Sequence, residues 1–371
     1  MLVYYASIIV YIFGYSLMAL IKRGLKLSGN FLFISLFVVV FGGVSASRAT
    51  TVGTDTGTYG AIFTSIGSSY GSQTILSSKY PLYELYNYLL YQISPNIQII
   101  TAANAIIIAI MIGKALSKLS ISFFFSSLLY VVGYYYFQSM NIGRQFIAAA
   151  LIMLGTAYLL EGRVKTFWLF EFLAVLIHST ALVGVLFFIV YIIHWSKKNI
   201  ILFVTISLAF FSLLPKMMPL ILKIFPSYAL YDNESGALSL ATQSNGGQTY
   251  VYLLYLIIMV IGTLLSNNYA KFRDQKFIFL SLIMGLTIIL GIVFSKQVLI
   301  SRLVLYFSLF VVIYIPMVMQ SISEAFLQKP QEKLLVTSIL NTAIIVIMLV
   351  PMTLQLTRNI SGVVPYFVFW K

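Results

Sequence analysis

Residues 30–44 of the chain read NFLFISLFVVVFGGV, an apolar run interrupted after its first residue only by Ser35. Similar runs of about 17–22 residues recur from one end of the 371-residue chain to the other, and each is long enough to cross about 30 Å of hydrocarbon as a helix. Hydrophobic residues make up 60% of the sequence and charged residues 9%, which is far from the composition of soluble proteins. The sequence therefore predicts a polytopic membrane protein.

Helices are expected rather than a barrel, because the runs are continuously apolar and do not alternate between apolar and polar residues. Twelve spans are predicted, at roughly 2–21, 31–47, 97–116, 120–137, 144–160, 166–178, 180–194, 199–215, 250–266, 276–294, 300–320 and 335–354. The run 166–194 admits two interpretations: one long tilted helix, or a hairpin that turns at His178, Ser179 and Thr180.

The sequence contains no cysteine, which excludes disulfides, thiolate metal sites and cysteine nucleophiles. The formal net charge is +14, but the basic residues are scattered between apolar runs. This distribution favours membrane topology and contact with anionic lipid or phosphate over nucleic-acid binding. No nucleic-acid partner is expected.

The distribution of Lys and Arg favours the hairpin, because cytoplasmic loops are enriched in these residues. With a hairpin, one side of the membrane receives Lys22, Arg23, Lys26, Lys114, Lys118, Arg163, Lys165, Lys197, Lys198, Lys271, Arg273, Lys276, Lys329 and Lys333. We expect this side to be cytoplasmic and both termini to be external. The chain is then a single membrane-embedded domain, 1–371, with external segments at 48–96 and 216–249.

This topology places several ionisable residues at the external ends of helices or in external loops, where such groups usually mark function. They are Arg48, Asp55, Glu84, Arg144, His178, Lys296 and Arg302. The first two belong to RATTVGTDTGTY, residues 48–59, whose Gly and Thr residues suit a turn before a short helix. Asp55 is either the cap of that helix or a functional carboxylate, and Arg48 is either an interfacial anchor or an anion ligand.

YPLYELYNYLLYQI, residues 80–93, is predicted to form an amphipathic helix that starts at Pro81 and lies in or re-enters the outer interface. Its polar face carries Glu84, which is either a functional carboxylate or an interfacial partner of an arginine. SMNIGRQFIAAA, residues 139–150, places Asn141, Arg144 and Gln145 at the mouth of a helix whose small residues permit close packing.

His178 lies within apolar sequence and is either a functional group or a buried hydrogen-bonding residue. SKQVLISRLVLYF, residues 295–307, sets Arg302 and Tyr306 one helical turn apart, with Lys296 just outside. Arginine suits phosphate because its planar fork donates two hydrogen bonds and keeps its charge. Three arginines and a lysine on one face can hold a pyrophosphate.

Motifs for metal sites and hydrolase triads are absent from the sequence, so neither a metal nor another cofactor is expected. Transfer of a sugar from a lipid pyrophosphate needs neither. Arginines would stabilise the departing pyrophosphate, and a carboxylate or histidine would accept the proton of the attacking hydroxyl.

Five short motifs, taken together, resemble the EpsG family of Wzy-type polysaccharide polymerases. They are Arg48 with Gly-Thr-Asp-Thr-x-x-Tyr (Gly53 to Tyr59), Pro-Leu-Tyr-Glu (Pro81 to Glu84), Asn-x-x-Arg-Gln-x-x-Ala (Asn141 to Ala148), His-Ser-Thr-Ala-Leu (His178 to Leu182) and Arg-x-x-x-Tyr (Arg302 to Tyr306).

The resemblance implies a metal-independent glycosyltransferase with a GT-C-like fold in the bacterial inner membrane, acting at its periplasmic face. It would join a growing glycan from undecaprenyl pyrophosphate to the non-reducing end of a new lipid-linked repeat unit of an O-antigen, capsule or exopolysaccharide. Asp55, Glu84 or His178 would then act as base or orient the acceptor. Substrate would be bound by Arg48, Arg144, Arg302, Lys296, Asn141, Gln145, Tyr59, Tyr83 and Tyr306.

Partners implied by this function are lipid-linked oligosaccharides, membrane lipid, and a chain-length regulator and flippase of the same pathway. Two other functions stay open. A flippase for lipid-linked oligosaccharides would need charges through the membrane depth, and a ligase that transfers the finished polymer would share the chemistry.

Overall fold

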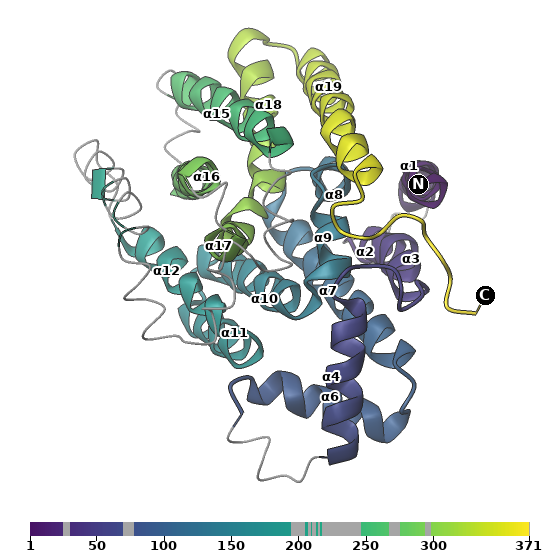
Figure 1. Ribbon diagram of the computed structural model, residues 1–371. Coiled ribbons are helices and arrows are strands. Elements are labelled where there is room, and N and C mark those ends of the chain that lie inside the picture. Colours follow the sequence, from purple (N-terminus) through teal and green to yellow (C-terminus); the bar gives the residue numbers. More distant parts are fainter. Residues whose placement is uncertain are drawn as a thin grey trace. The chain divides into compact units, whose positions relative to one another are not determined.

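The computed structural model describes residues 1–24, 30–69, 78–193, 246–266, 275–293 and 298–370, with a few isolated positions between 205 and 216. Within these residues the chain is helical throughout, apart from one isolated bridge between Arg48 and Val368 (Figure 1). Contacts divide it into two compact units, Met1–Gly184 with Ile344–Lys371, and Val185–Ala343. Two compact helical units can belong to one membrane domain or to two, so the predicted single domain, 1–371, stays a prediction.

The first unit begins with α1 (Leu2–Gly24), α2 (Phe31–Phe37), the π-helical turn η1 (Val38–Gly42), α3 (Gly43–Ala46), α4 (Thr56–Ser69), α6 (Pro81–Ile93) and α7 (Gln98–Leu119). It continues with α8 (Phe123–Val132), α9 (Tyr135–Asn141), α10 (Gly143–Leu160), α11 (Val164–Ile177) and the 3-10 helix η2 (Ser179–Gly184). The second unit contains α12 (Val185–Ile192), α15 (Gly246–Ser266), α16 (Gln275–Val293), α17 (Val298–Ser308) and α18 (Val311–Phe326). α19 (Pro330–Thr357) starts in the second unit and continues into the first.

Six described helices are long and apolar enough to cross a membrane, which confirms a polytopic, all-helical membrane protein. They are Leu2–Arg23, Gln98–Leu119, Gly143–Leu160, Gln275–Ile292, Arg302–Phe326 and Pro330–Thr357, with shorter apolar helices at Phe31–Ala46, Phe123–Val132, Ser179–Ile192 and Tyr250–Leu264. Twelve crossings stay a prediction. The predicted span 199–215 and nearly all of the predicted loop 216–249 lie outside the described residues.

α10 is the centre of the first unit and packs between α7 and α11 (Figure 1). Nearly all of its side chains are buried, including Ala148, Ala149 and Ala150. At Gly155 an added Cβ would lie 2.9 Å from the Cβ of Phe170 on α11, so only glycine permits this approach. Small residues on α10 therefore allow the close helix packing that the sequence predicted.

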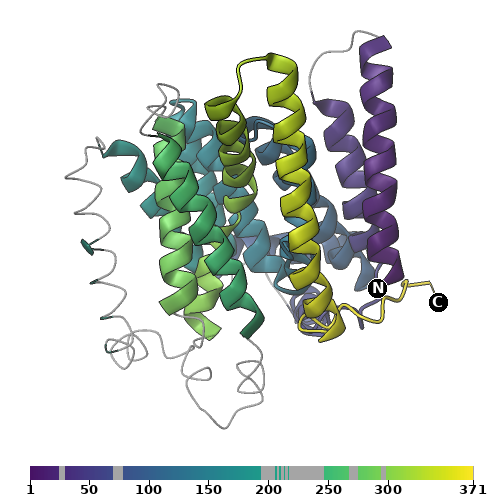
Figure 2. The ribbon, with the colours of Figure 1, turned by 90° about the horizontal axis from the view of Figure 1, so that it is seen from above.

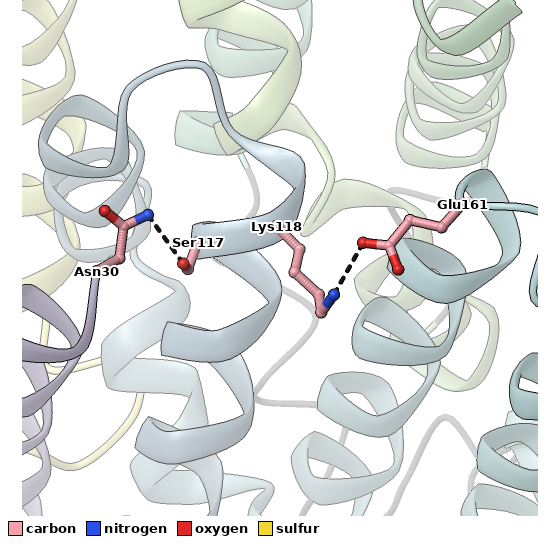
Figure 3. A network of polar contacts seen from close by, with 4 residues as sticks. All are labelled: Asn30, Ser117, Lys118 and Glu161. Atoms are coloured by element: carbon pink, nitrogen blue, oxygen red, sulfur yellow. Dashed lines mark hydrogen bonds and ion pairs between the residues drawn. The ribbon is translucent and has the colours of Figure 1, made fainter. Parts of the chain in front are cut away.

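Polar contacts join the helices at the end of α7 that lies near Leu119 (Figure 3). Asn30, just before α2, donates to the Ser117 hydroxyl (3.0 Å), and Lys118 forms an ion pair with Glu161 at the end of α10 (2.8 Å). α7 has 22 residues, about 33 Å of helix, so the residues near Gln98 lie a full span away. The contacts of Asn30 with Ser117 and of Lys118 with Glu161 therefore lie about one helix length from Gln98.

Two predicted helices are interrupted. The predicted span 120–137 was expected to be continuous, but α8 ends at Val132 and α9 begins at Tyr135, because Tyr134 adopts a left-handed conformation with φ 72°. The predicted span 31–47 contains the π-helical turn η1, a feature that often occurs close to functional residues. Hydropathy cannot detect either feature, since both interruptions consist of apolar or aromatic residues.

The chain turns back after α11, as the hairpin interpretation of 166–194 requires. α11 ends at Ile177, and His178 is extended, with φ −151° and ψ 114°. η2 then packs against α11, and at Gly184 an added Cβ would lie 2.0 Å from the Glu171 carboxylate. Because Gly184 meets a residue one to two turns before the end of α11, the direction has reversed within η2.

The segment after α3 contains two helices, α4 and α6, that contact each other near one end of α7 (Figure 1). α6 begins at Pro81 and buries Tyr83 and Asn87, while Leu85 and Leu89 are exposed, so the predicted helix is confirmed and its place in the outer interface stays a prediction. The N-terminal end of α1 lies beside the last residues of the chain (Figure 2), where the Tyr4 hydroxyl donates to the Val363 carbonyl (2.7 Å).

In the second unit, α16 contacts α15, α17 and α18, and α15 also packs on α18. Gly262 of α15 faces α18, where an added Cβ would lie 2.8 Å from the Tyr314 hydroxyl. Phe277 of α16 stacks on the same tyrosine ring, at 5.6 Å between centroids. Tyr314 therefore joins three helices of this unit.

Candidate functional site

The loop between α3 and α4 is fixed by Asn141, the last residue of α9. The Asn141 Oδ1 atom accepts a hydrogen bond from the Asp55 backbone N–H (2.8 Å) and another from the Thr54 hydroxyl (2.6 Å). Asp55 directly precedes α4, and its Oδ1 atom lies 3.3 Å from the Thr54 hydroxyl. The motif residues Asp55 and Asn141, which are far apart in the sequence, are therefore neighbours.

The last residues of the chain, 359–369, run along the same loop and are called here the C-terminal segment. The backbone N–H groups of Ala49, Gly53 and Thr54 donate to the carbonyls of Phe367, Gly362 and Ser361 at 2.8, 2.8 and 3.2 Å. Gly53 has φ 100°, a backbone conformation available to glycine but strained for other residues. The shape of the loop before Asp55 thus depends on Gly53 and on the C-terminal segment.

Arg48 is buried at the point where two helices end. Its guanidinium donates to the Ser45 carbonyl of α3 (2.5 Å), the Ser45 hydroxyl (2.8 Å) and the Met140 carbonyl of α9 (3.0 Å). Carbonyls in the last turn of a helix lack partners within the helix, and a cation there also interacts favourably with the helix dipole. Burial lowers the pKa of Arg48 to about 10, which leaves it protonated at neutral pH.

Arg144 is held differently, by aromatic rings. Its guanidinium carbon lies 3.9 Å from the centroid of the Tyr80 ring and 5.6 Å from that of Tyr83. Its Nε atom is buried without a hydrogen-bond partner, and no carboxylate lies within ion-pair distance of it in the described part of the chain. Arg144 is therefore a cation whose charge is not neutralised by a neighbouring acid.

Tyr59 of α4 completes the ring group around Arg144. Its ring centroid lies 6.4 Å from that of Tyr83. Burial raises the pKa of Tyr59, the neighbouring Tyr83 and Asp55 raise it further, and Arg144 lowers it. The Tyr59 backbone N–H also donates to the Asp55 carbonyl (3.0 Å), so direct contacts link Asp55 through Tyr59 and Tyr83 to Arg144.

His178 also lies beside Tyr80, at 5.8 Å between ring centroids. Its Nδ1 atom is 2.8 Å from the Thr180 hydroxyl and accepts a hydrogen bond from the Thr180 N–H (3.4 Å). These contacts hold the imidazole ring in place beside Tyr80. We refer to the residues joined in this way as the Arg144 cluster: Asp55, Tyr59, Tyr80, Tyr83, Asn141, Arg144 and His178.

Glu84 lies one turn into α6 and accepts a hydrogen bond from Ser78 through Oε1, while its Oε2 atom is buried without a partner. Gln145 follows Arg144 in α10 and is buried. Arg302 and Tyr306 are both in α17 and belong to the second unit, where Tyr306 is buried and Arg302 is half-buried. Lys296 lies outside the described residues. The functional roles of these residues stay predictions.

Two contributors were missed by the sequence analysis. Tyr80, the residue before Pro81, contacts both Arg144 and His178, and no role had been predicted for it from the sequence. The C-terminal segment had no motif at all. Among the described residues, no group of three or more His, Cys, Asp or Glu side chains is arranged to hold a metal ion.

Taken together, the helices and the Arg144 cluster define a polytopic membrane protein with an uncompensated arginine, an acid and a histidine gathered at one end of its first unit. The EpsG family matches residues 30–368, nearly the whole chain. The chain belongs to the EpsG family, a family of Wzy-like polysaccharide polymerases. No curated protein and no solved structure gives a significant match, and the GT-C-like fold stays a prediction.

Proposed function

We propose that the protein polymerises lipid-linked glycan repeat units. A growing glycan on undecaprenyl pyrophosphate would be transferred to the non-reducing end of a new lipid-linked unit at the outer face of the bacterial inner membrane. Membership of the EpsG family supports a role in polysaccharide polymerisation. The observation that carries the proposal for this chain is the guanidinium of Arg144, which is held by tyrosine rings and keeps its charge for an anion.

The reaction needs a stabilised leaving group. The acceptor hydroxyl oxygen attacks the anomeric carbon of the donor glycan, the bond from that carbon to the pyrophosphate oxygen breaks, and the electron pair leaves with the pyrophosphate. Arg144 would stabilise the negative charge that develops there, an effect worth roughly 100-fold or more in rate.

The proton of the attacking hydroxyl goes to a base, and we assign this role to Asp55. Asp55 directly precedes α4, one turn from Tyr59, and its backbone N–H is held by Asn141. Glu84, which accepts a hydrogen bond from Ser78 through Oε1, is the alternative base. General-base catalysis contributes typically about 10²- to 10⁴-fold, so Asp55→Asn should reduce the rate by at least ~100-fold.

The test is polymerisation by the purified protein in lipid nanodiscs. With a defined undecaprenyl-pyrophosphate repeat unit, the wild-type protein should produce a ladder of longer glycans, also with EDTA present, and Arg144→Ala should not. Arg163→Ala is a matched control, because Arg163 lies over Tyr158 (4.6 Å) just beyond the opposite end of α10. Absence of a ladder with several repeat units, or full activity of Arg144→Ala, would refute the proposal.

The same assay separates the alternatives. A ligase would transfer one glycan to a different acceptor and produce no ladder, and a flippase would move the lipid-linked unit across the bilayer without extending it. The flippase alternative has less support, because Arg48, Asp55, Arg144 and His178 gather at one end of the helices of the first unit.

A further inference from the structure

Tyr80 is the residue on which the contacts of the Arg144 cluster converge. Three side chains that can carry positive charge surround its ring: Arg144 at 3.9 Å, Lys79 at 5.5 Å and His178 at 5.8 Å. Arg144 comes from the first turn of α10, and His178 follows the end of α11. Tyr80 thus joins two helices through contacts of its ring.

The local structure at the start of α6 frees the Tyr80 ring for these contacts. Tyr80 is the N-cap residue, but its side chain makes no capping hydrogen bond. Its backbone is fixed instead, because its N–H donates to the Ser78 hydroxyl (3.0 Å) and its carbonyl accepts from the Glu84 N–H (3.0 Å). Pro81 further restricts the chain at the first helical position. The ring is therefore held at a defined place without taking part in the cap.

A ring holds a guanidinium in a way that a carboxylate cannot. The negative face of the π system attracts the cation, yet it carries no net charge and accepts none of the strong hydrogen bonds that a guanidinium donates in its own plane. A carboxylate would neutralise Arg144 and compete with an anionic substrate. In the described part of the chain, no side chain accepts a hydrogen bond from the Arg144 guanidinium.

We infer that Tyr80 is a positioning residue that orients Arg144 for a pyrophosphate group. Its ring sets the plane of the guanidinium, leaves the two terminal nitrogens available to phosphate oxygens, and keeps the imidazole of His178 beside the same anion. The choice of pyrophosphate rests on the proposed function, whereas the positioning of Arg144 rests on the contacts of the ring.

Binding of inorganic pyrophosphate to the purified protein, measured by titration calorimetry in nanodiscs, tests this inference without requiring polymerisation. Tyr80→Phe keeps the ring and should bind within about twofold of wild type. Tyr80→Leu keeps the bulk but not the π system and should raise the Kd roughly tenfold, which corresponds to about 1.4 kcal/mol. Tyr91→Leu is the control, because Tyr91 lies on the same helix and packs on Phe63 (5.4 Å).

A second measurement distinguishes positioning from a general structural effect. In the Arg144→Ala background, Tyr80→Leu should raise the Kd for pyrophosphate by less than about twofold, since the ring then has no guanidinium to orient. An equal loss of pyrophosphate affinity in both backgrounds would overturn the inference. The same holds if Tyr80→Leu binds pyrophosphate as tightly as wild type, or if the wild-type protein binds none at millimolar concentrations. A protein that binds pyrophosphate in this pattern but extends no glycan would refute the proposed function alone.

Discussion

Arg48→Ala should mainly lower stability and Arg144→Ala should mainly weaken substrate binding, although both arginines belong to the same predicted phosphate-binding set. Arg48 is 4% exposed and donates to two helix ends, at Ser45 and Met140. Removing it leaves buried carbonyls without partners. Since a hydrogen bond from a charged group contributes about 1.5–3 kcal/mol, we expect a loss of about 3–5 kcal/mol in the free energy of unfolding.

Arg144→Ala should cost less stability, about 0.5–2 kcal/mol, because it removes only the cation–π contacts with Tyr80 and Tyr83. Thermal unfolding of both variants in the same detergent, with Arg163→Ala as reference, measures the difference. Pyrophosphate binding, measured well below the melting temperature of each variant, should persist in Arg48→Ala and be strongly weakened, but still measurable at millimolar pyrophosphate, in Arg144→Ala.

Arg48→Lys is a further control, because a single ammonium cannot reproduce the planar fork that reaches both helix ends. It should recover only part of the stability lost in Arg48→Ala. Equal melting temperatures for Arg48→Ala and wild type would refute the structural role, and loss of pyrophosphate binding by a folded Arg48→Ala protein would restore its predicted role as a phosphate ligand.

Three further predictions concern the loop before α4 and the topology. Gly53→Ala should lower the melting temperature and the polymerisation rate, because φ is 100° and the new Cβ would lie 3.0 Å from the Met140 carbonyl. Gly57→Ala is the control and should change neither quantity, because its new Cβ would meet no atom within 4 Å. Deleting residues 360–371 should increase hydrogen exchange at Gly53 and Thr54, whose N–H groups lose their acceptors, while protection in α7 stays unchanged; equal exchange in both proteins would contradict this. In a chain with no other cysteine, His178→Cys should react with a membrane-impermeant thiol reagent from outside, and labelling only from the cytoplasm would overturn the topology.

Long apolar helices could be predicted from the sequence because hydrophobic length alone determines them. α7 and α10 appear where the runs 97–116 and 144–160 indicated them. The break at Tyr134 and the π-helical turn at Val38–Gly42 could not be predicted, since both depend on backbone geometry within sequence that is apolar or aromatic on either side.

The motif residues could be identified from the sequence, but it could not be predicted which of them stabilise the fold and which bind substrate. Arg48 and Arg144 look equivalent as isolated arginines, and only their surroundings separate them: helix carbonyls for one, tyrosine rings for the other. A cation that is fixed by hydrogen-bond acceptors has little left to donate to a ligand, whereas a cation held on a π face keeps its donors. In this chain the partners of an arginine, more than its presence in a motif, indicate which one is suited to bind phosphate.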